Sequence, residues 1–355
     1  MIDVGFPVIK YERGASPNEW GRLHGETYRE AIHELVEIRT GLMREKNSGL
    51  TDDAIKQLAT EQWEATRKLD QALFDEIQGI AEGANLSIEA IVIVNNYTDF
   101  RDIEVADQGC SMVFVNESAP IAGQTWDMHG SAKNYVCVID VEGPADRQIV
   151  FSLVGCVGMM GYSSSGTMIG VNNINTDGAR PGAMWPAIVR KTLQQNSLAT
   201  MRKELTSSPV TSGHNYLIAD QSAGEMWEVM PDLSEKVLDS TNHSRIFHTN
   251  HCLGEQAQLR EHKLAHNSTT YERYDLIKKK IDSLTSFEDV YGLLNDHENY
   301  PRSICSNFQS DSQDPSVTCG GAIGNLQTGQ VKMWRGDELY DDNFVRHQFQ
   351  LEPGE

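Results

Sequence analysis

The spacing of apolar residues changes once along the chain, at the pair Gly109–Cys110, and this change constrains the fold more than any other feature. Residues 18–45 place apolar side chains at helical intervals, namely Trp20, Leu23, Tyr28, Ile32, Leu35, Ile38 and Leu42. A second helical pattern covers residues 55–84, after the capping run 51–53, and a shorter one covers 87–100. The first 109 residues therefore predict a helical segment.

After Cys110 the period falls to two. Short alternating runs predict strands at 111–117, 120–129, 134–143, 147–155, 167–174, 214–221, 224–231 and 245–251, and a hairpin at 322–338. Helical patterns return at 183–195, 197–206, 269–284 and 286–296. Helices that lie outside several consecutive hairpins are typical of an α+β domain in which helices cover antiparallel sheets.

The charge of the chain argues against several classes of partner. Its 355 residues are 39% hydrophobic, and acidic residues outnumber basic ones by 51 to 30, giving a formal charge of −21. Such a surface repels nucleic-acid phosphates and anionic lipid, so we expect neither as a partner. The N-terminus lacks the pattern of a secretory signal, and no apolar run approaches the about 20 residues of a membrane span. Six scattered cysteines indicate reduced thiols, so we expect a cytoplasmic protein.

The pair Gly109–Cys110 has two interpretations. Cys110 could be an ordinary buried thiol at the start of a strand. Alternatively, it is a masked nucleophile, because a thiol that uses its own α-amine as base must become the first residue of a chain. Glycine suits the position before such a cut, since it lacks a Cβ and tolerates strained backbone angles. The second interpretation predicts that the chain cleaves itself between Gly109 and Cys110.

A site of this type needs a carboxylate beside the new amine and donors for the oxyanion. Asp127 lies one hairpin after Cys110, so strand pairing would bring it back beside the nucleophile. Asn250, in the segment HTNHC, and Asn172 or its neighbour Asn173 are candidate amide donors. A metal site in HTNHC is the alternative, but no second motif with ligand spacing supports it, and we predict no metal and no cofactor.

Five segments in the same order resemble the acyl-coenzyme A:6-aminopenicillanate acyltransferase family, a self-cleaving group of N-terminal-nucleophile hydrolases. The first is the Gly109–Cys110 step itself. The others are GQTWDMHGSAKN, MIGVNNI followed by ARPG, RIFHTNHCL followed by TTYERYDLI, and ENYPRSICS.

The resemblance implies a four-layer αββα fold with two stacked antiparallel sheets. It would be built from a small α chain, residues 1–109, and a β chain, residues 110–355, which together form one domain. It also implies that Cys110 is the nucleophile, Asp127 the carboxylate near the amine, Asn250 an oxyanion donor and Asn172 a further site residue.

One departure from the family concerns an arginine. The penicillin-forming member carries a catalytic-site arginine shortly after its SIC segment, whereas the corresponding stretch here, SNFQSDSQDPSVTCGG, has none. Arg302, just before that segment, could supply the charge, although a surface position is the preferred interpretation. The departure argues against assigning penicillin as the substrate.

The sequence therefore predicts a self-processing cysteine amidohydrolase that acts on a small N-acylated amine or amino acid through a thioester. Alternatives are an acyl-coenzyme A-dependent N-acyltransferase, an uncut binding protein with a structural Cys110, or a papain-like protease that pairs Cys110 with His214 or His251. A site of the bile-salt or penicillin V hydrolase type is disfavoured, because that group normally begins at its cysteine. The expected partners are a small amide, possible acyl-coenzyme A, the two chains of one precursor, and a further copy of the protein.

Overall fold

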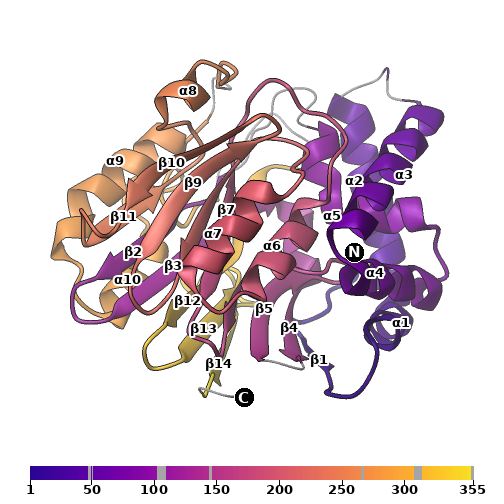
Figure 1. Ribbon diagram of the computed structural model, residues 1–355, viewed down its shortest axis with the longest axis horizontal. Coiled ribbons are helices and arrows are strands. Elements are labelled where there is room, and N and C mark those ends of the chain that lie inside the picture. Colours follow the sequence, from indigo (N-terminus) through magenta and orange to yellow (C-terminus); the bar gives the residue numbers. More distant parts are fainter. Residues whose placement is uncertain are drawn as a thin grey trace.

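Two stacked sheets form the centre of the computed structural model, which describes residues 1–46, 49, 51–101, 109–143, 146–264, 268–307 and 314–352 (Figure 1). The eight-stranded sheet contains, in spatial order, β1 (Val8–Tyr11), β4 (Val136–Glu142), β5 (Arg147–Leu153), β6 (Met160–Ser163), β7 (Met168–Asn173), β8 (His214–Ala219), β9 (Gly224–Met230) and β10 (Leu233–Asp239). The six-stranded sheet contains β11 (Arg245–His248), β2 (Met112–Asn116), β3 (Pro120–His129), β12 (Ser316–Asn325), β13 (Gln330–Arg335) and β14 (Val345–Gln350). Neighbouring strands are antiparallel except β1 and β4, which are parallel.

Helices cover the outer face of each sheet. On the eight-stranded sheet lie α6 (Trp185–Leu193) and α7 (Leu198–Ser207), and on the six-stranded sheet lie α9 (Thr270–Lys280) and α10 (Phe287–Leu294). The inner faces meet through contacts of β2 and β3 with β7, and of β11 with β9. The expected four-layer αββα arrangement is therefore confirmed. Short elements complete the chain: α8 (Glu255–Gln258) and the 3₁₀ turns η1 (Gly130–Tyr135) and η2 (Ile281–Ser283).

The N-terminal helices form a group beside α6 (Figure 1). They are α1 (Pro17–Thr27), α2 (Arg29–Lys46), α3 (Asp52–Leu69), α4 (Gln71–Ala84) and α5 (Ile88–Arg101). The two long helical patterns of the sequence are each divided. The second breaks at Asp70, whose backbone ends α3 and whose side chain accepts a hydrogen bond from Leu73 N to cap α4. Periodicity alone does not show this break, because an aspartate N-cap preserves the apolar spacing on both sides.

Close backbone contact fixes α1 against α4. A Cβ at Gly21 would lie 1.9 Å from the carbonyl oxygen of Glu76, and a Cβ at Gly79 would lie 2.1 Å from that of Asn18. Only glycine permits this approach, so the glycines of α4 serve packing and not only helix termination. Among the described residues, no single helix is long and apolar enough for a membrane span. The pair formed by α4 and residues Ile88–Asp99 of α5 has the required length and apolarity, but it is bent by 117°.

Candidate active site

The hairpin of β2 and β3 brings Asp127 beside the Gly109–Cys110 pair. Met112 lies opposite Gln124, and the ladder continues beyond β2, where Thr125 N donates to Ser111 O at 2.9 Å and Asp127 N donates to Gly109 O at 2.8 Å. The expected placement of Asp127 one hairpin after the cysteine is therefore found. Gly109 and Cys110 come shortly before β2, Asp127 lies near the end of β3, and Cys110 is only 6% exposed.

Gly109 allows charged side chains to approach the backbone closely. A Cβ here would lie 2.4 Å from Oδ2 of Asp127 and 3.2 Å from Nη2 of Arg273. The missing Cβ lets a carboxylate and a guanidinium approach the peptide bond.

The backbone of Cys110 is held on both sides. Its N–H donates to Oδ1 of Asn250 at 2.7 Å, and its carbonyl oxygen accepts from Nη1 of Arg273 at 2.7 Å. Nη2 of Arg273 also donates to Oδ1 of Asn250 at 2.9 Å, so this oxygen accepts hydrogen bonds from both the Cys110 N–H and Arg273. These contacts fix the orientation of the residue that carries the thiol.

The amide orientation of Asn250 follows from its neighbours. Its oxygen faces two donors, Cys110 N–H and Arg273, whereas its Nδ2 donates to the carbonyl oxygen of Asn173 at 2.8 Å. In the uncut chain, Asn250 is therefore an acceptor toward Cys110, and its donor group is occupied by Asn173. The predicted role as an oxyanion donor remains a prediction for the cut form.

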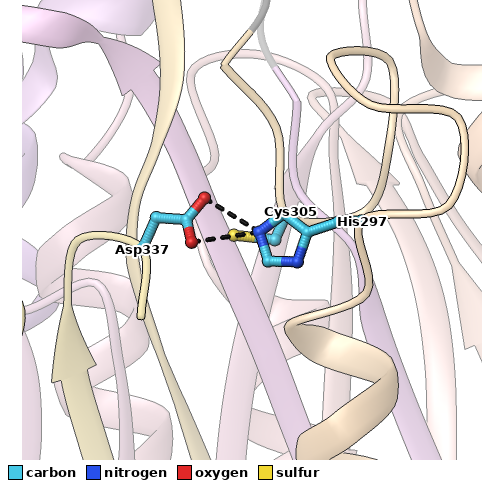
Figure 2. A group of neighbouring side chains, drawn as sticks. All are labelled: His297, Cys305 and Asp337. Atoms are coloured by element: carbon cyan, nitrogen blue, oxygen red, sulfur yellow. Dashed lines mark hydrogen bonds and ion pairs between the residues drawn. The ribbon is translucent and has the colours of Figure 1, made fainter. Parts of the chain in front are cut away.

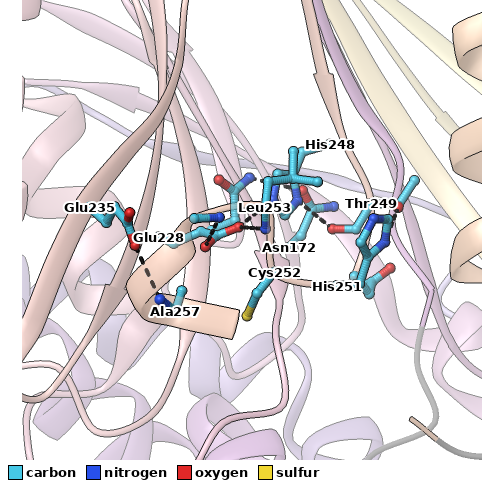
Figure 3. Close-up of polar contacts among 12 residues, drawn as sticks. Asn172, Glu228, Glu235, His248, Thr249, His251, Cys252, Leu253 and Ala257 are labelled. Atoms are coloured by element: carbon cyan, nitrogen blue, oxygen red, sulfur yellow. Dashed lines mark hydrogen bonds and ion pairs between the residues drawn. The ribbon is translucent and has the colours of Figure 1, made fainter. Parts of the chain in front are cut away.

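A buried carboxylate holds the segment that carries Asn250. Glu228, on β9, is fully buried and lies 2.9 Å from Nε2 of His248, while it accepts hydrogen bonds from Leu253 N at 2.6 Å and Gly254 N at 3.1 Å (Figure 3). The contacts flank Asn250 on both sides. The Glu228 carboxylate thus fixes the loop position of an amide that touches the nucleophile, and His248 is engaged in this pairing.

Asn172 lies deeper between the sheets than Asn250. Its side chain is fully buried, and its Oδ1 accepts from Nδ2 of Asn215 at 3.2 Å, which also contacts the Met112 sulfur (Figure 3 shows Asn172). Its neighbour Asn173 meets Asn250 through the backbone. The two adjacent asparagines therefore have different partners, since Asn172 contacts Asn215 and Asn173 contacts Asn250. The catalytic role of Asn172 remains a prediction.

Gln124 was not singled out by sequence, yet it joins the two sheets at the site. Its side chain donates to Val171 O at 2.5 Å and accepts from Val171 N at 2.8 Å, and it also contacts the Cys110 thiol. This pairing satisfies both the backbone N–H and the backbone carbonyl of Val171, on β7. Its position in the segment GQTWD was the signal that could have identified it.

Burial and charge set the protonation of the central pair. Burial raises the pKa of Asp127 to about 7, against the opposing effects of Arg273 and the Thr318 hydroxyl, which donates to Oδ1 at 2.7 Å. Burial, and next the charge of Asp127, raise the pKa of the Cys110 thiol to about 12. The thiol is therefore protonated at neutral pH in the uncut chain and needs a base to react.

Arg273 is the functional candidate that sequence reasoning missed. It is 1% exposed on α9, and besides Cys110 and Asn250 it donates to Ser111 Oγ at 3.0 Å and Thr269 Oγ1 at 3.0 Å. Burial lowers its pKa, whereas the nearby Asp127 opposes this change. The signal available in the sequence was an arginine on the apolar face of a helix, in line with Thr270, Leu276 and Ile277.

The surface interpretation of Arg302 is supported by the structure. Its Nη2 donates to Oε1 of Glu272 at 2.7 Å, and these side chains are 36% and 44% exposed. The stretch in which the family has its arginine includes residues 308–313, which lie outside the described residues. The cation beside the nucleophile here comes from Arg273.

The histidines of the papain-like alternative have other partners. His251 Nδ1 lies 3.2 Å from Thr249 Oγ1 and 3.1 Å from Thr270 Oγ1, and burial lowers its pKa to about 4. His214 Nε2 lies 3.7 Å from Asp99. The groups that hold Cys110 are instead Asn250 and Arg273.

Comparison with known proteins agrees with the resemblance seen in the sequence. A family model described as acyl-coenzyme A:6-aminopenicillanic acid acyl-transferase matches residues 115–321, which is more than half of the chain. A protein of Emericella nidulans named acyl-coenzyme A:6-aminopenicillanic-acid-acyltransferase 40 kDa form is 26% identical over 305 residues, 83% of each chain. The matched range contains Asp127, Asn172 and Asn250 and begins after Cys110.

Solved structures with a partial likeness include a conjugated bile acid hydrolase and a penicillin V acylase. A mutant form of conjugated bile acid hydrolase from Clostridium perfringens has a TM-score of 0.43 and 10% identity, covering 70% of this chain and 95% of that one. Penicillin V acylase from Agrobacterium tumefaciens has a TM-score of 0.34 and 12% identity, covering 64% and 82%.

Proposed function

Because the chain belongs to the acyl-coenzyme A:6-aminopenicillanic acid acyl-transferase family, we propose that it is a self-processing cysteine amidohydrolase that cleaves a small N-acylated amine or amino acid through Cys110. One observation carries this proposal. The peptide unit joining Gly109 to Cys110 is hydrogen-bonded at its carbonyl by Asp127 N–H and at its N–H by Asn250. The Asp127 contact continues the ladder of β2 and β3, whereas the Asn250 contact comes from a side chain 140 residues away in sequence.

The first step is self-cleavage. The Cys110 sulfur attacks the carbonyl carbon of Gly109, and the developing oxyanion is stabilised by the backbone N–H of Asp127, which lies 2.8 Å from that oxygen. The Asp127 carboxylate takes the thiol proton. The C–N bond then breaks, the nitrogen of Cys110 gains a proton to become an amine, and the Gly109 acyl group rests on sulfur as a thioester. Water hydrolyses the thioester and leaves a Gly109 carboxylate and a free thiol.

The new amine is the base of the mature site. An α-amine has an intrinsic pKa of about 7.7–8.0, so at working pH it can take the thiol proton and return it to a leaving amine. Asn250 Oδ1, which accepts from this nitrogen in the uncut chain, is positioned to accept from the amine as well. Arg273 supplies the cation that the family's arginine supplies elsewhere, and it holds the carbonyl of Cys110.

The substrate reaction repeats the same chemistry between molecules. Sulfur attacks the carbonyl carbon of the substrate amide, the amine part leaves with a proton, and the acyl group stays on Cys110 as a thioester. Water then releases the acid. We favour hydrolysis over transfer because water reaches any thioester that the site does not seal.

Acyl transfer is the second candidate, and the family supports it, since its description names an acyl transfer from coenzyme A. Transfer from an N-acyl donor differs from hydrolysis in the last step alone, where an amine replaces water. Transfer from acyl-coenzyme A differs in the first step as well, because the thiol of coenzyme A leaves in place of an amine. Adding an acceptor amine to a reaction with a fixed N-acyl substrate separates hydrolysis from transfer. A transferase yields a new amide at the expense of free acid, whereas a hydrolase yields free acid at every amine concentration.

The two chains of the cut protein would remain one folded unit. Residues 1–109 would form the α chain, whose helices α4 and α5 pack against α6 of the β chain, residues 110–355. All six cysteines lie within the described residues, where none forms a disulfide, which fits the proposed cytoplasmic location.

Intact mass and amine release test the proposal together. Freshly purified wild-type protein is expected to consist of two chains, which result from a cut between Gly109 and Cys110. The Cys110→Ala variant should stay a single chain. The matched control is Cys137→Ala, a substitution of another buried thiol in the other sheet, which should be cut normally. Release of primary amine from a panel of N-acyl compounds should require the cut. A single uncut wild-type species, or a Cys110→Ala variant that is still cut, would overturn the proposal.

A further inference from the structure

The geometry points to a second site, a divalent transition-metal site for Zn²⁺ formed by His297, Cys305 and Asp337 (Figure 2). One donor atom from each of these three side chains lies within 4.8 Å of the other two. The site does not depend on the proposed chemistry of Cys110.

Different parts of the chain supply the ligands. His297 and Cys305 come from the segment after α10, and Asp337 follows β13. Cys305 is fully buried, while the side chains of His297 and Asp337 are 14% and 12% exposed. The site therefore has one ligand inside the protein and two at its edge, which leaves a path for an ion to enter.

Backbone contacts fix the ligands in place. Cys305 N donates to Asp296 O at 3.0 Å, and Asp337 Oδ1 accepts from Leu339 N at 2.9 Å. A site whose ligands are already held by the fold needs little reorganisation when the metal binds.

The donor atoms converge, which distinguishes a metal site from a nucleophilic triad. In a triad, the two nitrogens of the histidine serve different partners, the nucleophile on one side and the carboxylate on the other. Here a single nitrogen, Nε2 of His297, faces both Asp337 oxygens at 3.0 and 2.9 Å, and the Cys305 sulfur lies beside the same carboxylate (Figure 2). The other ring nitrogen points away from the group. All three side chains therefore face one point.

The types of donor select the metal. Zn²⁺ binds thiolate, imidazole and carboxylate at about 2.0–2.3 Å in a tetrahedral arrangement, whereas Ca²⁺ and Mg²⁺ prefer oxygen ligands alone. Three protein ligands leave a fourth position for water or another small ligand. Binding would displace the thiol proton of Cys305 and replace the direct contact of His297 with Asp337 by bonds to the ion.

The proposed metal site has a structural link to Asp127. The hydroxyl of Thr318 contacts the Cys305 sulfur and donates to Oδ1 of Asp127 at 2.7 Å. One threonine therefore separates a metal ligand from the carboxylate beside Gly109.

Cobalt binding provides the test, because Co²⁺ replaces Zn²⁺ and a cobalt–thiolate bond has a charge-transfer absorption. The full chain carrying Cys110→Ala is stripped with chelator and titrated with Co²⁺, so that neither the nucleophile nor its cleavage contributes. One equivalent is expected to produce the thiolate absorption, and Zn²⁺ should displace it. The same titration of wild-type protein should give the same site.

Three further variants in that background complete the test. Cys305→Ala should abolish the absorption, and the ligand variant His297→Asn should weaken binding by more than about tenfold. Cys137→Ala, another buried thiol, should bind as before. Circular dichroism confirms folding of each variant. An absent thiolate absorption in the folded parent, or an absorption that survives Cys305→Ala, would overturn the metal site and leave the proposed function untouched.

Discussion

The backbone N–H of Asp127 lies 2.8 Å from the carbonyl oxygen of Gly109, so the residue that supplies the carboxylate also supplies a donor at the bond proposed to break. Both groups reach this place because β3 pairs with β2 in a register that extends beyond the strand to Gly109. One residue can therefore stabilise the oxyanion through its backbone and accept a proton through its side chain.

Gly109→Ala should slow self-cleavage. The added methyl group would lie 2.4 Å from Asp127 Oδ2, so the carboxylate or the peptide must move. Overpacking costs about 1–3 kcal/mol, and if that cost falls on the transition state the rate is lower by about fivefold to about 150-fold. The measurement is the fraction of uncut chain over time after cell-free synthesis. Gly292→Ala is the control, because a Cβ there meets no described atom within 4 Å, and equal rates for the two variants would contradict the prediction.

Self-cleavage should accelerate as pH rises through about 7. Burial raises the pKa of Asp127 to about 7, so the carboxyl is protonated at pH 5 and can accept the thiol proton only when it ionises above that pKa. Asp127→Asn should be slow and lack this dependence. Burial also raises the pKa of Asp99 to about 7, so Asp99→Asn serves as the control and should keep the wild-type profile. A profile that falls with pH would exclude Asp127 as the base.

Arg273→Gln should impair both cleavage and stability. The substitution leaves Asp127 without its nearby cation and removes a donor from Cys110 O and Asn250 Oδ1, a loss of about 3–5 kcal/mol in the free energy of unfolding. Because Arg273 lowers the pKa of Asp127, the midpoint of the cleavage profile should move to higher pH. Denaturant unfolding and the pH profile are the measurements.

Two variants distinguish this role of Arg273 from general loss of structure. Arg273→Lys keeps the charge and should retain part of the activity, with a smaller shift of the midpoint. Arg302→Gln removes a surface arginine and should leave both measurements unchanged. An unshifted midpoint in folded Arg273→Gln would show that the guanidinium does not act on Asp127.

Glu228→Gln should lower kcat more than it changes KM. The carboxylate accepts from Leu253 N and Gly254 N and contacts His248, and these contacts fix the loop that carries Asn250. An amide in its place has one acceptor fewer, so Asn250 shifts relative to Cys110, and misplacement of about 1 Å costs up to about 100-fold. Steady-state kinetics on the cleaved substrate measure the effect.

The control for Glu228 is a second carboxylate that binds the same region. Glu235 accepts from Gln256 N and Ala257 N at the start of α8, away from Asn250 (Figure 3). Glu235→Gln should therefore leave kcat near the wild-type value. Equal losses in the two variants would mean that loop stability, and not the position of Asn250, limits the reaction.

Many elements followed from local pattern. The strand at 120–129 has the bounds expected from alternation, and α6, α7, α9 and α10 lie where helical spacing indicated them. By contrast, β1 has only four residues and pairs in parallel with a strand far along the chain, so its short sequence carries little signal. The kink of α5 at Asn96 was not predicted either, because it leaves the composition of the helix unchanged.

The candidate site was accessible to sequence only where its parts lie close together in the chain. The approach of Asp127 to Gly109 follows from a single hairpin, whose two strands alternate and whose turn is short. Arg273 and Glu228 were missed because their partners lie on other elements, far away in sequence. The amide orientation of Asn250 is likewise decided by Asn173, on the opposite sheet.

By itself, the sequence determined the change from helices to strands at Gly109–Cys110, the α+β class and the hairpin that returns Asp127 to the pair, because side-chain period and hairpin pairing are local properties of a chain. Only the tertiary structure decided that Gly109 is needed for space and that the cation comes from Arg273. Only it placed His297, Cys305 and Asp337 around one point. Burial, the protonation it sets and contacts between distant segments exist only once the sheets and helices have packed together.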